Sequence, residues 1–246
     1  MEMNEMINKA EKLAQAIEFT HLDNTATSEE MKAFFEKAKE YPFYAVVVLP
    51  HFVKLAKEEL KDTNMKVVTV VDFPLGAGNT EGKVAEAKAA IADGADEIDM
   101  MANIPAIKER DFEYVKNDIK AVKEAIGDHI LKVIIENPLL NEDEMAGASR
   151  MCEEAGADFV KTSSGFNGKQ HFYSLMESLR IMKKNAPHLE MKAAGGIDNY
   201  KLANNVLAAG VSKIGTSSGH IIMDQLNHVL DNQKVDPNQK TGPRLI

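Results

Sequence analysis

The sequence predicts an α/β fold, a single (β/α)8 barrel over residues 1–246, from three observations. Short apolar runs alternate with amphipathic helical stretches along the chain. Several helical stretches end in a glycine that returns the chain into the next apolar run, as at Gly94, Gly156 and Gly210. No linker or block of like charge divides the chain, and 246 residues is a usual length for one barrel.

Eight apolar runs have the length and composition of buried strands. The expected strands are 16–20, 44–49, 66–71, 97–101, 131–136, 159–162, 191–194 and 213–215. An open, doubly wound sheet is the alternative fold. Such a sheet usually has a glycine-rich turn after its first strand, and residues 20–25 contain no glycine. The barrel is therefore favoured.

Helix starts between these runs carry recognisable capping residues. Thr27 with Glu30 matches a capping box. Thr80, Asn141 and Asp198 are expected to open the helices 81–93, 142–154 and 200–209. The tail, 233–246, is polar and contains proline, which is compatible with a flexible end.

Charge and cysteine content narrow the class of protein. A net charge of −9 disfavours nucleic acid and anionic membrane as partners. Cys152 is the single cysteine, so no intrachain disulfide can form and a reducing compartment is expected. No run approaches the roughly 18 apolar residues that span a bilayer. The sequence thus predicts a soluble, cytoplasmic protein.

Charged residues lie within or beside the apolar runs of five predicted strands. In a (β/α)8 barrel the functional side chains gather at the carboxyl ends of the strands. Any one buried charge has a structural ion pair as its alternative explanation. Five in one barrel favour a function, and they are Glu18, Asp99, Lys132, Lys161 and Lys192.

Lys161 and Lys192 predict carbonyl chemistry because they lie on neighbouring strands, which are about 4.8 Å apart. Burial and the like charge of Lys192 would lower the pKa of Lys161 and leave a free amine. A free amine attacks carbonyl carbon and forms a Schiff base. Asp99 and Lys132 also lie on neighbouring strands, so the carboxylate can pair with Lys132 and pass protons through water.

Two small-residue turns follow the seventh and eighth strands, where these barrels usually bind phosphate. The first contains Gly195 and Gly196, and the second contains Ser217 and Ser218 and leads into a helix over 221–230. Backbone N–H groups at a helix start bind anions. A lysine amine beside such turns predicts an aldolase acting on a phosphorylated sugar.

Six segments resemble motifs of the 2-deoxyribose-5-phosphate aldolase family: 73–76, 97–100, 132–136, 159–166, 192–197 and 214–219. The similarity runs in order from about residue 17 to residue 222. It implies a class I lyase, without metal or cofactor, that cleaves 2-deoxy-D-ribose 5-phosphate to acetaldehyde and D-glyceraldehyde 3-phosphate. It also leaves a homodimer open, because relatives are often dimers.

The resemblance also implies roles for individual residues. Lys161 matches the Schiff-base lysine, Lys192 the lysine that tunes it, Asp99 the proton-relay aspartate and Lys132 its supporting lysine. The expected substrate-binding residues are Glu18, Thr20, Thr162 and Gly165, with Gly195, Gly196, Ser217 and Ser218 at the phosphate.

The first three predicted strands depart from the family pattern. Glu18 stands where aspartate is common, Val47 and Leu49 replace polar residues, and Asp72 replaces a glycine. Drift of the pocket walls is one explanation. The other is a changed substrate, with Glu18 and Asp72 binding an extra hydroxyl or excluding an anionic group. A diverged Schiff-base aldolase is therefore the alternative function, and a non-catalytic sugar-phosphate-binding protein is the less favoured one.

Overall fold

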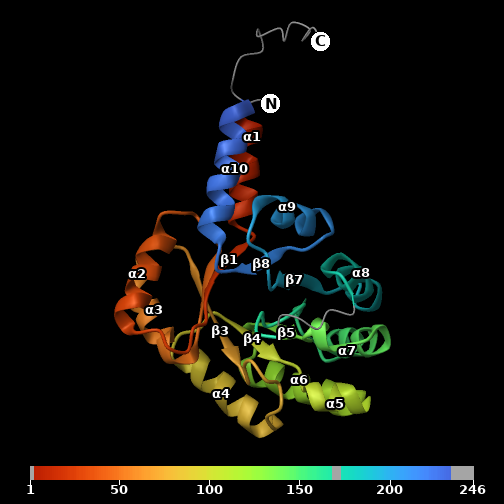
Figure 1. Ribbon diagram of the computed structural model, residues 1–246. Coiled ribbons are helices and arrows are strands. Elements are labelled where there is room, and N and C mark those ends of the chain that lie inside the picture. The colour runs from red at the N-terminus through yellow and green to blue at the C-terminus, as the bar shows by residue number, and fades with distance from the viewer. Residues whose placement is uncertain (1–2, 168–172, 234–246) are drawn as a thin grey trace, which may run out of the picture.

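Eight parallel strands close into a barrel in chain order, which confirms the predicted fold (Figure 1). The structure, a computed structural model, describes residues 3–167 and 173–233. The strands are β1 (Ile17–His21), β2 (Ala45–Val48), β3 (Lys66–Val71), β4 (Glu97–Met101), β5 (Ile130–Ile134), β6 (Phe159–Lys161), β7 (Glu190–Ala194) and β8 (Lys213–Thr216). β1 pairs with both β2 and β8 and so closes the ring.

The predicted strand bounds agree with the structure to within two residues. The largest difference is at β5, which ends at Ile134 instead of residue 136. The physical reason is the backbone of Glu136, which has φ 55° and ψ 56°. This left-handed conformation cannot continue a strand. Of the predicted tail 233–246, residue 233 ends the last helix and the rest lies outside the described residues. The assignment of one domain stays a prediction.

Helices cover the outside of the barrel. They are α1 (Met3–Ala14), α2 (Ser28–Lys39), α3 (Val53–Glu59), α4 (Thr80–Ala92), α5 (Ile104–Glu109), α6 (Phe112–Ile126), α7 (Glu142–Glu154), α8 (Leu175–Asn185), α9 (Tyr200–Ala208) and α10 (Gly219–Gln233). Two 3-10 turns, η1 (Pro50–Phe52) and η2 (Asn137–Leu139), follow β2 and β5. The alternation of strand and helix is not strict, because both α5 and α6 lie between β4 and β5.

Side-chain caps fix several helix starts. The predicted capping box of Thr27 and Glu30 is present at α2, and Asn141 caps α7 as expected. Two predicted caps are wrong by one residue. Asn79 caps α4 by accepting from the N–H of Gly82, and Asn199 caps α9. In both cases the asparagine side chain takes the cap that the sequence analysis gave to its neighbour.

The barrel interior divides into an apolar half and a charged half. Under β1 to β3 lies an apolar cluster of Leu22, Ala45, Val47, Val68 and Val70. The other half holds six buried ionisable side chains, which are Glu18, Glu97, Asp99, Lys132, Lys161 and Lys192. Since branched apolar residues normally fill such a barrel, the charged half is the part of the interior that calls for a functional explanation.

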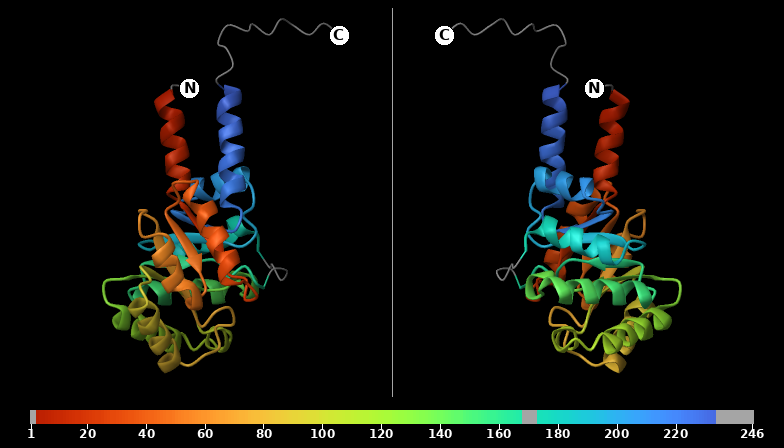
Figure 2. Two further views of the ribbon diagram at one scale, coloured as in Figure 1. Left: turned by 90° about the vertical axis from the view of Figure 1, so that its left-hand side faces the viewer. Right: turned by 90° about the vertical axis from the view of Figure 1, so that its right-hand side faces the viewer.

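α1 and α10 lie at one side of the barrel and extend from it in the same direction (Figures 1 and 2). The start of α10 lies directly after β8, so its first turn is at the carboxyl end of the strands. None of the helices in the two described ranges is long and apolar enough to cross a bilayer.

Candidate active site

Lys161 and Lys192 occupy paired positions on β6 and β7, as predicted from the order of the strands. Their Nζ atoms lie 2.7 Å and 2.6 Å from the same atom, Oδ2 of Asp99. All three side chains are buried. One carboxylate oxygen, from β4, therefore contacts both lysines inside the barrel.

Lys132 completes the ion-pair cluster from β5, where it pairs in register with Asp99 of β4. Its Nζ lies 3.2 Å from Oδ1 of Asp99 and 2.5 Å from Oε2 of Glu97. A third carboxylate, Oε1 of Glu18, is 3.3 Å away. Lys132 thus neutralises the side of Asp99 that faces away from Lys161.

Glu18 lies within this cluster and outside the cavity wall. Its Oε2 accepts a hydrogen bond from Lys192, and its side chain has no exposed surface. Its Oε1 has no hydrogen-bond partner and only the ion pair with Lys132. The structure therefore gives Glu18 contact with the two lysines, where the sequence analysis expected contact with substrate.

Burial lowers the pKa of Lys161 to about 8, and the neighbouring ammonium of Lys192 acts in the same direction. The carboxylate of Asp99 opposes both effects. The sequence analysis named burial and the Lys192 charge as causes, and the larger one is burial. Lys161 is consequently a free amine in a minor fraction at pH 7, far more than an ordinary lysine would be.

The pKa of Asp99 shifts well below its ordinary value. Burial alone would raise it, but the ammonium groups of Lys132, Lys161 and Lys192 together outweigh that cost. Burial would likewise lower the pKa of Lys132, but the carboxylates of Asp99, Glu18 and Glu97 raise it above the ordinary lysine value. Asp99 is held as a carboxylate and Lys132 as an ammonium.

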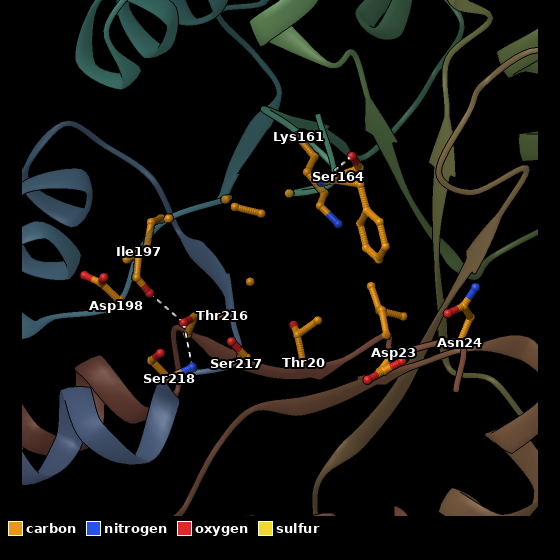
Figure 3. A pocket seen from close by; sticks show the side chains of 17 residues that line it. Thr20, Asp23, Asn24, Lys161, Ser164, Ile197, Asp198, Thr216, Ser217 and Ser218 are labelled. Carbon is orange, nitrogen blue, oxygen red and sulfur yellow. Dashed lines mark hydrogen bonds between the residues drawn. The ribbon is translucent and has the colours of Figure 1, made fainter. Parts of the chain in front are cut away.

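A cavity of about 460 Å³ opens at the carboxyl ends of the strands, and the Lys161 side chain points into it (Figure 3). Of the twelve residues predicted for the site, seven line this cavity: Thr20, Lys161, Gly165, Gly195, Gly196, Ser217 and Ser218. Asp99, Lys132, Lys192 and Glu18 lie in the cluster beneath Lys161. Among the described residues that line the cavity, Lys161 is the one lysine.

Thr162 does not line the cavity. Its hydroxyl donates to the carbonyl of Ala194 and accepts from the N–H of the same residue, at 3.1 Å and 2.9 Å. Both bonds join the end of β6 to β7 and are buried. The structure therefore gives Thr162 a contact that joins the strand of Lys161 to the strand of Lys192, and its expected role in substrate binding stays a prediction.

The two small-residue turns come together on one wall of the cavity. Gly195 and Gly196 have φ of +91° and +70°, which side chains rarely tolerate. The Thr216 hydroxyl donates to the carbonyl of Ile197 and accepts from the N–H of Ser218, which ties the turn after β8 to the turn after β7 (Figure 3). The first N–H groups of α10 follow at once, so this wall is rich in backbone donors.

Several cavity residues were not predicted. On the wall formed by the loop after β1 are Leu22, Asp23 and Asn24, and from the loop after β6 come Ser164 and Phe166. Residues 164 and 166 lie in the segment 159–166 that resembles a family motif, but neither they nor the residues after β1 were given a role. Glu97 was not predicted either, because it begins β4, and functional side chains are expected at the carboxyl ends of barrel strands.

Glu136 holds the loop that carries these residues. Its fully buried carboxylate accepts from the N–H of Ser164 at 3.2 Å and from the side-chain amide of Asn167 at 3.3 Å. The left-handed backbone of Glu136 directs the chain from β5 into η2. The loop after β6, which bounds the cavity beside Lys161, is therefore fixed to the end of β5.

Asp72 also lies away from the cavity. Its carboxylate accepts from the N–H of Gly78 at 3.0 Å and lies 3.4 Å from Nζ of Lys83, a buried lysine of α4. Its φ of 54° places it in the left-handed region. These contacts assign Asp72 to the turn after β3 and give it no described contact with the cavity.

Among the residues that the structure describes, no three His, Cys, Asp or Glu side chains are grouped so as to hold a metal ion. Cys152 is buried on α7, and burial raises the pKa of its thiol.

Comparison with known proteins agrees with this geometry. The family model for DeoC/LacD family aldolases matches residues 10–224. A deoxyribose-phosphate aldolase of Thermococcus kodakarensis is 47% identical over 223 residues, which cover 89% of this chain and 98% of that protein. One of Brevibacillus brevis is 45% identical over 204 residues, covering 82% and 91%.

Solved structures give the same result. The aldolase QR15 superposes with a TM-score of 0.82 at 35% identity, covering 91% of this chain and 99% of that one. A tetrameric deoxyribose phosphate aldolase from Aeropyrum pernix has a TM-score of 0.79 at 25% identity, covering 93% and 100%. The chain thus belongs to the DeoC/LacD family of aldolases.

Proposed function

We propose that this chain is a class I aldolase that cleaves 2-deoxy-D-ribose 5-phosphate to acetaldehyde and D-glyceraldehyde 3-phosphate through a Schiff base on Lys161. The observation that carries the proposal is the position of Lys161, whose amine points into the cavity above a buried pair of Asp99 and Lys192. The names of relatives that are 43–47% identical supply the substrate.

The reaction begins when the free amine of Lys161 attacks the aldehyde carbon of the open-chain sugar. Loss of water from the carbinolamine, with uptake of one proton, gives a protonated imine. The amine is available because its pKa is lowered to about 8. The ammonium form must lose a proton before attack, and Asp99, 2.7 Å from Nζ and held as a carboxylate, relays that proton to solvent.

Carbon–carbon cleavage follows, with the iminium as the electron sink. Asp99, acting through a water molecule, removes the proton of the C3 hydroxyl, and that oxygen becomes the aldehyde of glyceraldehyde 3-phosphate. The electrons of the C2–C3 bond move to C2 and form an enamine on Lys161. A proton then returns to C2, and water hydrolyses the resulting imine to acetaldehyde and the free amine.

The phosphate is proposed to bind at the wall formed by Gly195, Gly196, Ser217 and Ser218. The wall offers backbone N–H groups and the N-terminal end of α10, a 15-residue helix. This end of the cavity is separate from the base that holds Lys161. Binding energy at the phosphate can therefore position C3 for proton removal.

The described geometry bears on the alternative of a changed substrate. That hypothesis relied on Glu18 and Asp72, and neither residue lines the cavity. Glu18 contacts Lys192 and Lys132, and Asp72 contacts Gly78 and Lys83. The two departures thus lack the substrate contact that a changed specificity would require, which favours the substrate of the relatives.

We also propose a cellular setting and an assembly for this chain. The single, buried Cys152 favours a reducing, cytoplasmic setting. The tetramer formed by the Aeropyrum pernix relative favours self-association, of which a homodimer is the simplest form.

Borohydride trapping with 2-deoxyribose 5-phosphate, followed by peptide mass mapping, tests the proposal. We expect an ethyl group on Lys161, because this adduct requires both imine formation and C2–C3 cleavage. Lys83 is the internal control: it is equally buried but lies outside the barrel with Asp118, and its peptide should stay unmodified. Uncut sugar on Lys161 without any ethyl adduct would indicate a different substrate, and no adduct in the folded protein would contradict Schiff-base catalysis.

A further inference from the structure

The charge cluster continues below Asp99 to the amino-terminal end of the barrel. Glu97 is the first residue of β4, two positions before Asp99, and is buried. Its Oε2 accepts from Lys132 at 2.5 Å, and its Oε1 accepts from the hydroxyl of Tyr44, the residue before β2. A continuous set of hydrogen bonds therefore joins Lys161 to Tyr44 through Asp99, Lys132 and Glu97.

This extension changes the charge balance of the interior. The cluster contains three carboxylates and three lysines. It is neutral when all six are ionised, and it carries one negative charge when Lys161 is a free amine. Without the charge of Glu97, the same cluster would be neutral with Lys161 as a free amine.

We propose that Glu97 is a positioning residue that sets the pH range in which Lys161 is a free amine, acting through Lys132 and Asp99. The inference rests on the proposed function, since it needs Lys161 as the nucleophile. Glu97 lies at the opposite end of the barrel from the cavity and does not line it. Its influence is therefore carried by the cluster and not by contact with substrate.

Two effects of Glu97 on Lys161 have the same sign. Its negative charge favours the ammonium form of every lysine nearby. It also shares Lys132 with Asp99, and without it Lys132 would pair more strongly with Oδ1 of Asp99 and leave that carboxylate a weaker partner for Lys161. Removal of the Glu97 charge should thus extend the free amine of Lys161 to lower pH.

The other strands present a limited set of ionisable groups to this path. Glu18 of β1 and Lys192 of β7 flank Asp99 and Lys161. At the far end, Lys213 of β8 lies with Nζ 3.2 Å from the ring centroid of Tyr44. Within the described residues of β3, the interior positions Val68 and Val70 carry no charge. Lys213 is therefore the positive charge that opposes Glu97 at the amino-terminal end.

The test is the pH dependence of borohydride trapping at Lys161 in the full chain, compared between wild type, Glu97→Gln and Tyr44→Phe. Glu97→Gln removes the charge and keeps the shape. The trapping rate falls at low pH as Lys161 becomes protonated. We expect the midpoint of this fall, the acid limb of the profile, to move down by about one pH unit in Glu97→Gln. This is the effect of a unit charge about 10 Å away at an effective dielectric constant of about 20. Tyr44→Phe removes a hydrogen bond to the same carboxylate and keeps the charge, so its limb should coincide with that of wild type.

Other outcomes overturn the inference. An unshifted limb in Glu97→Gln would exclude a charge effect, and an equal shift in Tyr44→Phe would show that loosening of the barrel end is the cause. If Glu97→Gln does not fold, Lys213→Met takes its place, because Lys213 is only half-buried and is therefore easier to replace. Loss of this positive charge should move the acid limb to higher pH. No movement would overturn the inference. Absence of an adduct in wild type would instead overturn the proposed function itself.

Discussion

Lys161 and Lys192 are partners in register on β6 and β7, and both donate to a single oxygen of Asp99. The consequence appears when Lys161 becomes an imine and changes its hydrogen bonding. Asp99 still accepts from Lys192 through Oδ2 and from Lys132 through Oδ1. The carboxylate is therefore held in place by two other ammonium groups while the nucleophile passes through its covalent states.

The rate of imine formation should rise with pH around the pKa of Lys161. Because that pKa is lowered to about 8, the reactive amine is the minor form at pH 7 and the major form at pH 9. We expect the trapping rate with 2-deoxyribose 5-phosphate to increase over this range, with a midpoint near 8. A midpoint near 10, the ordinary lysine value, would contradict the environment described for Lys161.

Asp99→Asn should abolish most turnover, and Asp118→Asn is the matched control. Both carboxylates are buried and paired with lysines, but Asp118 pairs with Lys83 between α4 and α6, away from the cavity. Loss of a positioned base costs about 10²–10⁴ in kcat. Breaking the Asp118 pair should instead lower the free energy of unfolding by about 3–5 kcal/mol and leave kcat unchanged. Steady-state kinetics and urea unfolding of both variants separate the two roles, and equal losses of kcat would contradict them.

The residues at the carboxyl ends of the strands could be predicted from the sequence, because their position follows from barrel geometry. A residue at the carboxyl end of a buried strand must lie at the barrel mouth, and consecutive strands are neighbours. Lys161, Lys192 and the two small-residue turns follow from these facts alone. Asp99 and Lys132 follow in the same way from adjacent strands β4 and β5.

The contacts beneath Lys161 depend on how far each side chain extends and in which direction. Sequence spacing does not give this information. Glu18 and Thr162 are at the expected strand positions, but their side chains bond to Lys192 and to Ala194 instead of facing the cavity. Glu97 begins its strand, and only the length of Lys132 connects it to Asp99. The positive φ of Asp72 likewise has no signature in its neighbours.

Gly195→Ala should weaken phosphate binding more than Gly196→Ala does. An added Cβ at Gly195 would lie 2.6 Å from Oγ of Ser163, whereas at Gly196 no described atom lies within 4 Å. Both glycines have positive φ, so both variants carry a conformational cost of about 1 kcal/mol. Only Gly195→Ala must also displace either the turn or the Ser163 hydroxyl, which donates to the carbonyl of Ala194 at 2.7 Å. We expect its KM for the phosphorylated sugar to rise several-fold more, with kcat less affected, and similar KM values would argue against a phosphate site at this turn.

Glu18→Asp should lower turnover and Asp72→Gly should leave it unchanged, the reverse of what a substrate-binding role predicts. Shortening Glu18 by one methylene withdraws its carboxylate by about 1.5 Å, so Lys192 must give up either that partner or its 2.6 Å contact with Asp99. Asp72 bonds to Gly78 and Lys83, so its loss alters the turn after β3 and no part of the cavity. The measurement is kcat/KM for 2-deoxyribose 5-phosphate, with unfolding curves to show that each variant is folded. A rise in kcat/KM in either variant would mean that the replaced carboxylate restricts this substrate, and the altered strands β1 to β3 would then have to be explained by a different one.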